Sequence, residues 1–175
     1  MNNVSLGLGL ILSFIGLYPS FGQTNSDSVE FERLLNTSID FYRKKELDSA
    51  LFYVNSAIQL NSTSDYAYFR RSLIHEKLMN PAGTFADLST AIRLNPKAIY
   101  YNNRGLLYSF KENYKAALFD FNLAISIDST YGLTYYNKGS ALYYMGELSA
   151  ACLSMQKALI YEIDGSGEFL NEFCK

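Results

Sequence analysis

Few residues of this chain are of the types that perform acid–base or metal chemistry. The 175 residues include one histidine, His75, and two cysteines, Cys152 and Cys174. One histidine excludes any site built on a histidine pair, and two cysteines exclude a four-cysteine zinc site. Carboxylates such as Asp87 and Asp120 show no paired arrangement that sequence alone assigns to a general acid and base. The sequence therefore predicts a protein that is not an enzyme and that holds no metal or other cofactor.

The two cysteines leave two alternatives open. In an exported chain disulfides persist, and a bond between Cys152 and Cys174 would fasten the C-terminal end to the preceding helix. Otherwise Cys152 is a small buried residue and Cys174 is free near the C-terminus. A Cα separation above about 7 Å would exclude the bond.

Composition narrows the class of protein further. A net charge of −2 argues against a general nucleic-acid binder, which normally carries a basic field. Fifteen tyrosines and twelve phenylalanines with only three prolines argue against disorder. The length fits one domain or one array of repeats.

The N-terminal end has the pattern of an export signal. No residue from Met1 to Ser26 has a charged side chain, and the nearly continuous apolar run from Leu6 to Tyr18 is too short to span a bilayer. Ser20 and Gly22 place small residues at the −3 and −1 positions of a cleavage site. We therefore expect a signal peptide over residues 1–22, a short leader over 23–30, and a protein that is periplasmic, in the cell envelope or secreted. The n-region lacks lysine and arginine, so an uncleaved membrane anchor or a buried helix are the alternatives.

The remainder of the chain repeats one pattern. Ala57, Ala91, Ala124 and Ala158 recur at a nearly constant interval, and small residues recur seven positions earlier at Ala50, Thr84, Ala117 and Ala151. We call the equivalent residues of the four repeats a column. Three further columns lie upstream, and their residues are large, small and large in turn: Leu34, Tyr68, Tyr101, Tyr135; Ser38, Ser72, Gly105, Gly139; Phe41, His75, Tyr108, Leu142. Such spacing places each set on one face of a helix. His75 occupies a packing column, which favours a partly buried core residue over a catalyst.

These columns resemble the tetratricopeptide repeat, whose consensus has an aromatic residue, Gly and Tyr on the first helix and Tyr, Ala, an aromatic residue and Ala on the second. The third unit is nearest, with Tyr101, Gly105, Tyr108, Tyr114, Ala117, Phe121 and Ala124. The resemblance implies an all-α, right-handed α-solenoid of about four helix–turn–helix units, at 31–64, 65–97, 98–131 and 132–165. Residues 166–175, with Phe169, Leu170 and Phe173, are expected to form a short C-terminal cap helix.

The resemblance also implies where a partner binds. In this family the first helix of each unit lines a concave groove, and the matching positions here are largely aromatic and apolar. The partner-binding residues expected on this basis are Tyr42, Tyr66, Phe69, Asn102, Asn103, Phe110, Tyr136 and Tyr143.

We therefore expect a non-catalytic interaction scaffold or adaptor that binds a peptide segment or partner protein, and no nucleic acid, outside the cytoplasm. It would meet a membrane only if the N-terminal signal stays uncleaved. A self-associating structural module of the envelope is one alternative, and an envelope carbohydrate-binding protein is another.

Overall fold

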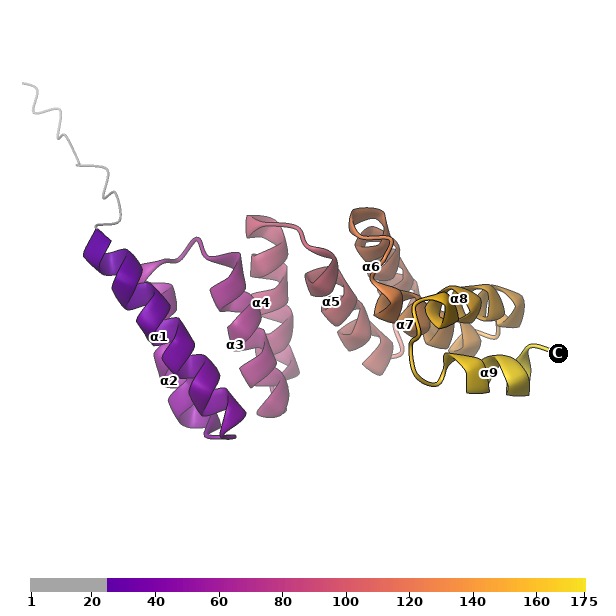
Figure 1. Ribbon diagram of the computed structural model, residues 1–175, viewed down its shortest axis with the longest axis horizontal. Helices are drawn as coiled ribbons and strands as arrows, with labels where there is room; N and C mark the ends of the chain where they lie inside the picture. Colours follow the sequence, from indigo (N-terminus) through magenta and orange to yellow (C-terminus); the bar gives the residue numbers. More distant parts are fainter. Residues whose placement is uncertain (1–24) are drawn as a thin grey trace, which may run out of the picture.

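The computed structural model describes residues 25–175, and within this range it consists of nine α-helices and no strand (Figure 1). The helices are α1 (Asn25–Arg43), α2 (Leu47–Leu60), α3 (Asp65–Lys77), α4 (Pro81–Leu94), α5 (Ala98–Phe110), α6 (Tyr114–Ile127), α7 (Gly132–Tyr144), α8 (Leu148–Ile160) and α9 (Ser166–Phe173). The predicted signal peptide lies outside the described residues.

The helices form four successive pairs that stack into an elongated solenoid (Figure 1). Unit one is α1–α2, unit two α3–α4, unit three α5–α6 and unit four α7–α8, and each second helix contacts the first helix of the next unit. The predicted α-solenoid with a C-terminal cap helix is confirmed. One boundary differs: α1 begins at Asn25, so residues 25–30 of the predicted leader are helical. An acidic residue in the first turn, Asp27, favours this earlier start, since it complements the helix dipole.

The turn inside each unit has one residue in the left-handed conformation at the same position. These residues are Lys45, Met79, Glu112 and Gly146, with φ of 64°, 55°, 57° and 81°. The left-handed residue ends the first helix and reverses the chain. In unit two Asn80 then starts α4, because its side chain accepts a hydrogen bond from the Gly83 N–H (3.0 Å) and Pro81 fits the first turn.

Small residues allow the helices of each pair to approach closely. The seven alanines of the two small columns of the second helices are completely buried, and Thr84 is 3% exposed. On the facing first helix Gly105 lies so close to the Phe121 ring that an added Cβ would come within 2.6 Å of it. The close helix contacts expected from these columns are therefore present.

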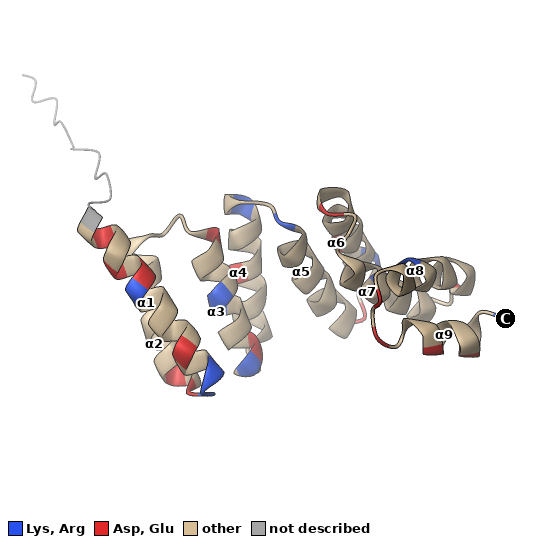
Figure 2. Cartoon of the chain, in the orientation of Figure 1, with Lys and Arg blue, Asp and Glu red and all other residues tan. Residues whose placement is uncertain are grey.

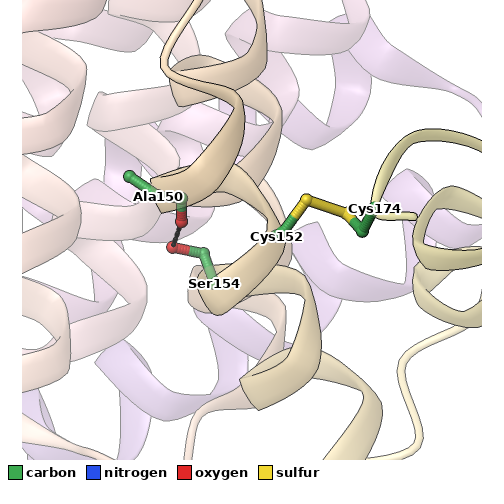
Figure 3. The surroundings of a disulfide bond; sticks show 4 residues. All are labelled: Ala150, Cys152, Ser154 and Cys174. Carbon is green, nitrogen blue, oxygen red and sulfur yellow. Dashed lines mark hydrogen bonds between the residues drawn. A yellow bond between two sulfur atoms is a disulfide. The ribbon is translucent and has the colours of Figure 1, made fainter.

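A disulfide between Cys152 of α8 and Cys174, directly after α9, joins the cap to the fourth unit (Figure 3). The two Cα atoms are 5.8 Å apart, inside the range that a disulfide spans. The bond closes a segment with a sequence separation of 22 and fixes α9 beside α8.

Candidate partner-binding groove

A hollow of about 600 Å³ opens between units two and three, where the last turns of α3 and α5 face the start of α4. Its lining is mostly apolar and comes from all three helices and the α3–α4 turn: Ser72, Leu73, Glu76, Lys77, Met79, Asn80, Pro81, Thr84, Leu88, Asn103, Leu106, Leu107 and Phe110. A cleft of this volume with an apolar lining is typical of a binding site.

Two large side chains at this groove are strongly exposed to solvent. Met79 is 87% exposed and Phe110 is 84% exposed. Met79 occupies the left-handed position of the α3–α4 turn, and Phe110 is the last residue of α5. Apolar side chains exposed this far beside an apolar hollow gain free energy when a partner covers them.

The polar groups of the groove are few. Glu76 and Lys77 contribute one charge of each sign, and neither forms an ion pair within residues 25–175. The side-chain oxygen of Asn103 accepts a hydrogen bond from the side-chain amide of Asn102 (3.4 Å). The side-chain N–H groups of Asn103 remain available to a ligand. This arrangement suits an uncharged or weakly charged segment whose backbone needs hydrogen-bond partners.

The predicted site residues divide into four pairs in the structure. Asn103 and Phe110 line the groove. Tyr42 and Tyr66 lie outside its lining: Tyr42 is half-buried with the Arg70 guanidinium 5.4 Å from its ring centre, and Tyr66 is 42% exposed at the start of α3.

Phe69 and Asn102 do not face a partner, contrary to our expectation. Phe69 is 7% exposed and its ring packs against Tyr100 with centroids 4.9 Å apart. Asn102 is completely buried, and its side-chain oxygen accepts a hydrogen bond from Asn137 at 2.9 Å. Both side chains therefore hold helices of successive units together and are closed to a ligand.

Tyr136 and Tyr143 lie against the C-terminal cap, and Tyr143 remains 37% exposed. The Tyr143 ring packs against Phe169 and Phe173 of α9, with centroids 5.3 Å and 4.9 Å away. Tyr136 lies against Gly165, just before α9. Helix α9 thus covers part of the surface that we expected to be open to a partner in unit four.

His75 has the environment of a packing residue. Its imidazole is 3.7 Å from Asp87 and 3.4 Å from the Asn80 amide nitrogen, and its side chain is 17% exposed. Across the described residues no cluster of three or more His, Cys, Asp and Glu side chains could hold a metal ion.

Ion pairs between helices are the main feature that sequence analysis missed. The Arg71 guanidinium donates two hydrogen bonds to Asp87 (2.8 and 2.7 Å), and Arg104 donates two to Asp120 (2.8 Å each). These hydrogen bonds raise the pKa of both arginines above the ordinary value. The two pairs therefore position α3 on α4 and α5 on α6.

Comparisons with known proteins agree with this architecture. Residues 98–131 match the family model described as Tetratricopeptide repeat. The human Tetratricopeptide repeat protein 13 is 29% identical over 172 residues, which cover 93% of this chain and 20% of that protein. Human Serine/threonine-protein phosphatase 5 is 44% identical over 64 residues, covering 36% of this chain and 13% of the phosphatase. The chain therefore spans about a fifth or less of the length of these curated relatives.

Solved structures share the fold at low sequence identity. A crystal structure of MamA superposes with a TM-score of 0.71 at 24% identity and covers 78% of this chain and 81% of its own. The structure of pilF from Pseudomonas aeruginosa gives a TM-score of 0.70 at 16% identity, covering 78% of this chain and 63% of its own. Among the described residues no helix combines the length and hydropathy needed to cross a membrane.

Proposed function

We propose that this chain, which matches the Tetratricopeptide repeat model at residues 98–131, is a non-catalytic scaffold that binds a segment of a partner protein in the groove between α3 and α5, outside the cytoplasm. The observation that carries the proposal is the apolar hollow flanked by Phe110 and Met79, which are 84% and 87% exposed. Such exposure on a folded domain is costly unless a partner covers it.

The groove favours an extended or short helical segment with one or two large apolar side chains. An apolar side chain inserted between Leu73 and Leu106 would be covered by Phe110, and full burial of such a side chain contributes about 1.5–3 kcal/mol. The Asn103 amide group is placed to hydrogen-bond the backbone of the bound segment. Burial of apolar side chains would supply the affinity, and the hydrogen bonds of Asn103 would fix the position of the bound segment along the groove.

Two observations support a location outside the cytoplasm. The apolar run from Leu6 to Tyr18 is followed by Ser20 and Gly22 at the spacing of a signal-peptidase site. The disulfide between Cys152 and Cys174 is of the kind that persists in oxidising compartments. Fractionation of cells that produce the full chain, probed at its C-terminal end, tests this part of the proposal.

Site-specific photo-crosslinking tests the groove. A photoreactive phenylalanine analogue at position 110 should cross-link a partner in the native extract, and the same analogue at position 52 should not. Phe52 is the matched control because it is 65% exposed on α2, away from the groove. Equal cross-linking from both positions, or a product at position 52 alone, would place the partner elsewhere. A cross-link from position 110 to a second copy of the chain would favour self-association instead.

A further inference from the structure

A second apolar surface lies on the second helices of units three and four. Phe119 of α6 is 64% exposed, and Leu153 and Ile160 of α8 are 65% and 68% exposed. Phe119 and Leu153 occupy the same position of successive units, and Ile160 lies two turns after Leu153 on the same side of α8. We call this surface the α6–α8 face. It is not part of the groove, whose lining ends at α5.

The charges of the α6–α8 face are all of one sign. Lys115 is one turn before Phe119, Lys157 is one turn after Leu153, and Lys138 of α7 lies between the two helices. None of these lysines forms an ion pair within the described part of the chain. The other exposed positions along this side of α6 and α8 are Asn122, Ser126, Ser149 and Gln156. The nearest carboxylate in the sequence, Asp120, is buried and paired with Arg104. The exposed carboxylates Glu112, Asp128, Glu147 and Glu162 lie beyond the ends of α6 and α8.

Lys138 connects the two helices into one surface. Its ammonium group donates a hydrogen bond to Asn122 of α6 at 2.8 Å. The same lysine lines a hollow of about 470 Å³ on α7 and α8 together with Tyr135, Leu153, Lys157 and Ile160. Two lysines and two exposed aliphatic side chains therefore meet around one shallow depression.

We propose that the α6–α8 face binds peripherally to a lipid bilayer that contains anionic lipids. Phe119, Leu153 and Ile160 enter the boundary between headgroups and acyl chains, and the lysine ammonium groups pair with lipid phosphates. The depression between Lys138 and Lys157 receives one anionic headgroup. The three apolar side chains are spread over two helices and are 64–68% exposed around a shallow depression, which favours a bilayer over an acidic peptide.

The equivalent surface of the first two units lacks this combination. Unit two has Ala86 where units three and four have Phe119 and Leu153. Unit one has Phe52 there, but Asp48 lies one turn before it on the same helix. Acidic and basic residues both occur along α1 and its turn into α2 (Figure 2). An anionic bilayer would therefore bind one end of the solenoid selectively.

Vesicle co-sedimentation of the full chain tests the proposal. The probes are vesicles of phosphatidylcholine alone and of phosphatidylcholine mixed with phosphatidylglycerol. Each lysine at an anionic surface contributes about 1 kcal/mol, or roughly fivefold in affinity, so Lys115→Gln with Lys157→Gln should weaken binding to the anionic vesicles about 30-fold. The apolar segment before Asp27 has no charged side chain, so its own membrane affinity is similar on both vesicles.

Lys44→Gln with Lys45→Gln is the matched control, because it removes two exposed lysines at the opposite end of the array. We expect this variant to bind anionic vesicles within about twofold of the parent chain, since its lysines contact no lipid in the proposed orientation. Phe119→Ala with Leu153→Ala should weaken binding with the circular-dichroism spectrum unchanged. Equal affinity for both vesicles, or equal losses in the two lysine variants, would overturn the proposal.

Discussion

Units two and three each join their two helices by a buried arginine–aspartate pair, whereas unit four has Lys138 and Ser154 at the same positions. Asp87 and Asp120 have side chains only 5% and 1% exposed, and each accepts two hydrogen bonds from its arginine. In unit four Lys138 turns to Asn122 of the preceding unit, and the Ser154 hydroxyl donates to the Ala150 carbonyl of its own helix (Figure 3).

The C-terminal end is held by a disulfide and an aromatic cluster instead. Phe169 continues the column that contains Tyr101 and Tyr135, so α9 is the first half of a fifth first helix in the same register. The next packing position, which holds Ser or Gly in the four units, is Phe173. A phenylalanine there hinders the close approach of a second helix of the kind that follows in the four units.

This difference shows what each position in a solenoid requires. An internal unit is covered by a neighbour on both sides, and its buried carboxylates therefore need paired charges. The terminal helix α9 has eight residues and a neighbour on one side only. Packing of so short a helix is weak, and the Cys152–Cys174 bond compensates by restricting the unfolded chain.

The largest effect is expected from breaking a pair in the middle of the array. Asp120→Ala leaves the Arg104 guanidinium, which is 18% exposed, without its carboxylate. Removing one partner of a buried ion pair costs about 3–4 kcal/mol, because the remaining charge stays desolvated. Urea denaturation followed by circular dichroism should show this loss. Asp128→Ala is the control, since Asp128 is exposed and its carboxylate accepts hydrogen bonds from Thr130 rather than from a buried arginine.

Installing the same pair in unit four gives the reverse experiment. Lys138→Arg with Ser154→Asp copies the residues of unit three into the fourth unit. We expect a change within about 1 kcal/mol of zero, because the desolvation of two new charges offsets their attraction. Ser154→Asp alone should be clearly destabilising. A large gain from the double variant would show that the terminal unit lacks only the ion pair.

The next largest effect is expected from removing the disulfide. Cys152→Ser with Cys174→Ser should lower the stability of the C-terminal end by about 2–3 kcal/mol, since the bond closes a segment with a sequence separation of 22. Hydrogen exchange should accelerate in α9 and around Tyr143, and remain unchanged in α3–α6. Loss of protection throughout the array would instead mean that the cap supports all four units.

Sequence alone predicted the repeat because small and apolar columns recur once in every unit. It did not predict the ion pairs, although Arg71 and Arg104 form one such column and Asp87 and Asp120 form another. We judged the aspartates for catalytic pairing within the sequence, whereas their partners are 16 residues away on the facing helix. The sequence therefore contains the information needed to predict the ion pairs, because the arginine column and the aspartate column are separated by 16 residues in both units.

The groove residues were harder to predict for a physical reason. Phe69 and Asn102 occupy a helix position that lies between neighbouring units, and its exposure depends on the angle between them. Met79 lines the groove only because the left-handed turn before α4 directs it there. No local pattern determines how far α3 and α5 separate, so sequence predicted which helices form the surface better than it predicted which side chains are open.

A smaller effect than the loss of the disulfide is expected from changing one glycine in unit three or unit four. A Cβ at Gly105 would meet the Phe121 ring at 2.6 Å. A Cβ at Gly139 would meet the Met155 side chain at 3.1 Å and the Ala151 carbonyl oxygen at 3.3 Å, which is a milder contact. An aromatic ring buried on all sides cannot yield, but a methionine side chain has rotatable bonds that can. After the helix-propensity gain of about 1 kcal/mol, Gly105→Ala should cost about 1–2 kcal/mol and Gly139→Ala should be near neutral, as measured by urea midpoints.

Unit two already shows how such a clash is relieved. Ser72 has a Cβ at the Gly105 position, and the residue opposite it is Leu88 rather than phenylalanine. Phe121→Leu should therefore rescue Gly105→Ala, so that the double variant is more stable than the sum of the two single losses predicts. Strict additivity of the two losses would contradict the packing argument. The rescue would show that the two columns vary together, with a larger residue on the second helix permitted only where the first helix has a smaller one.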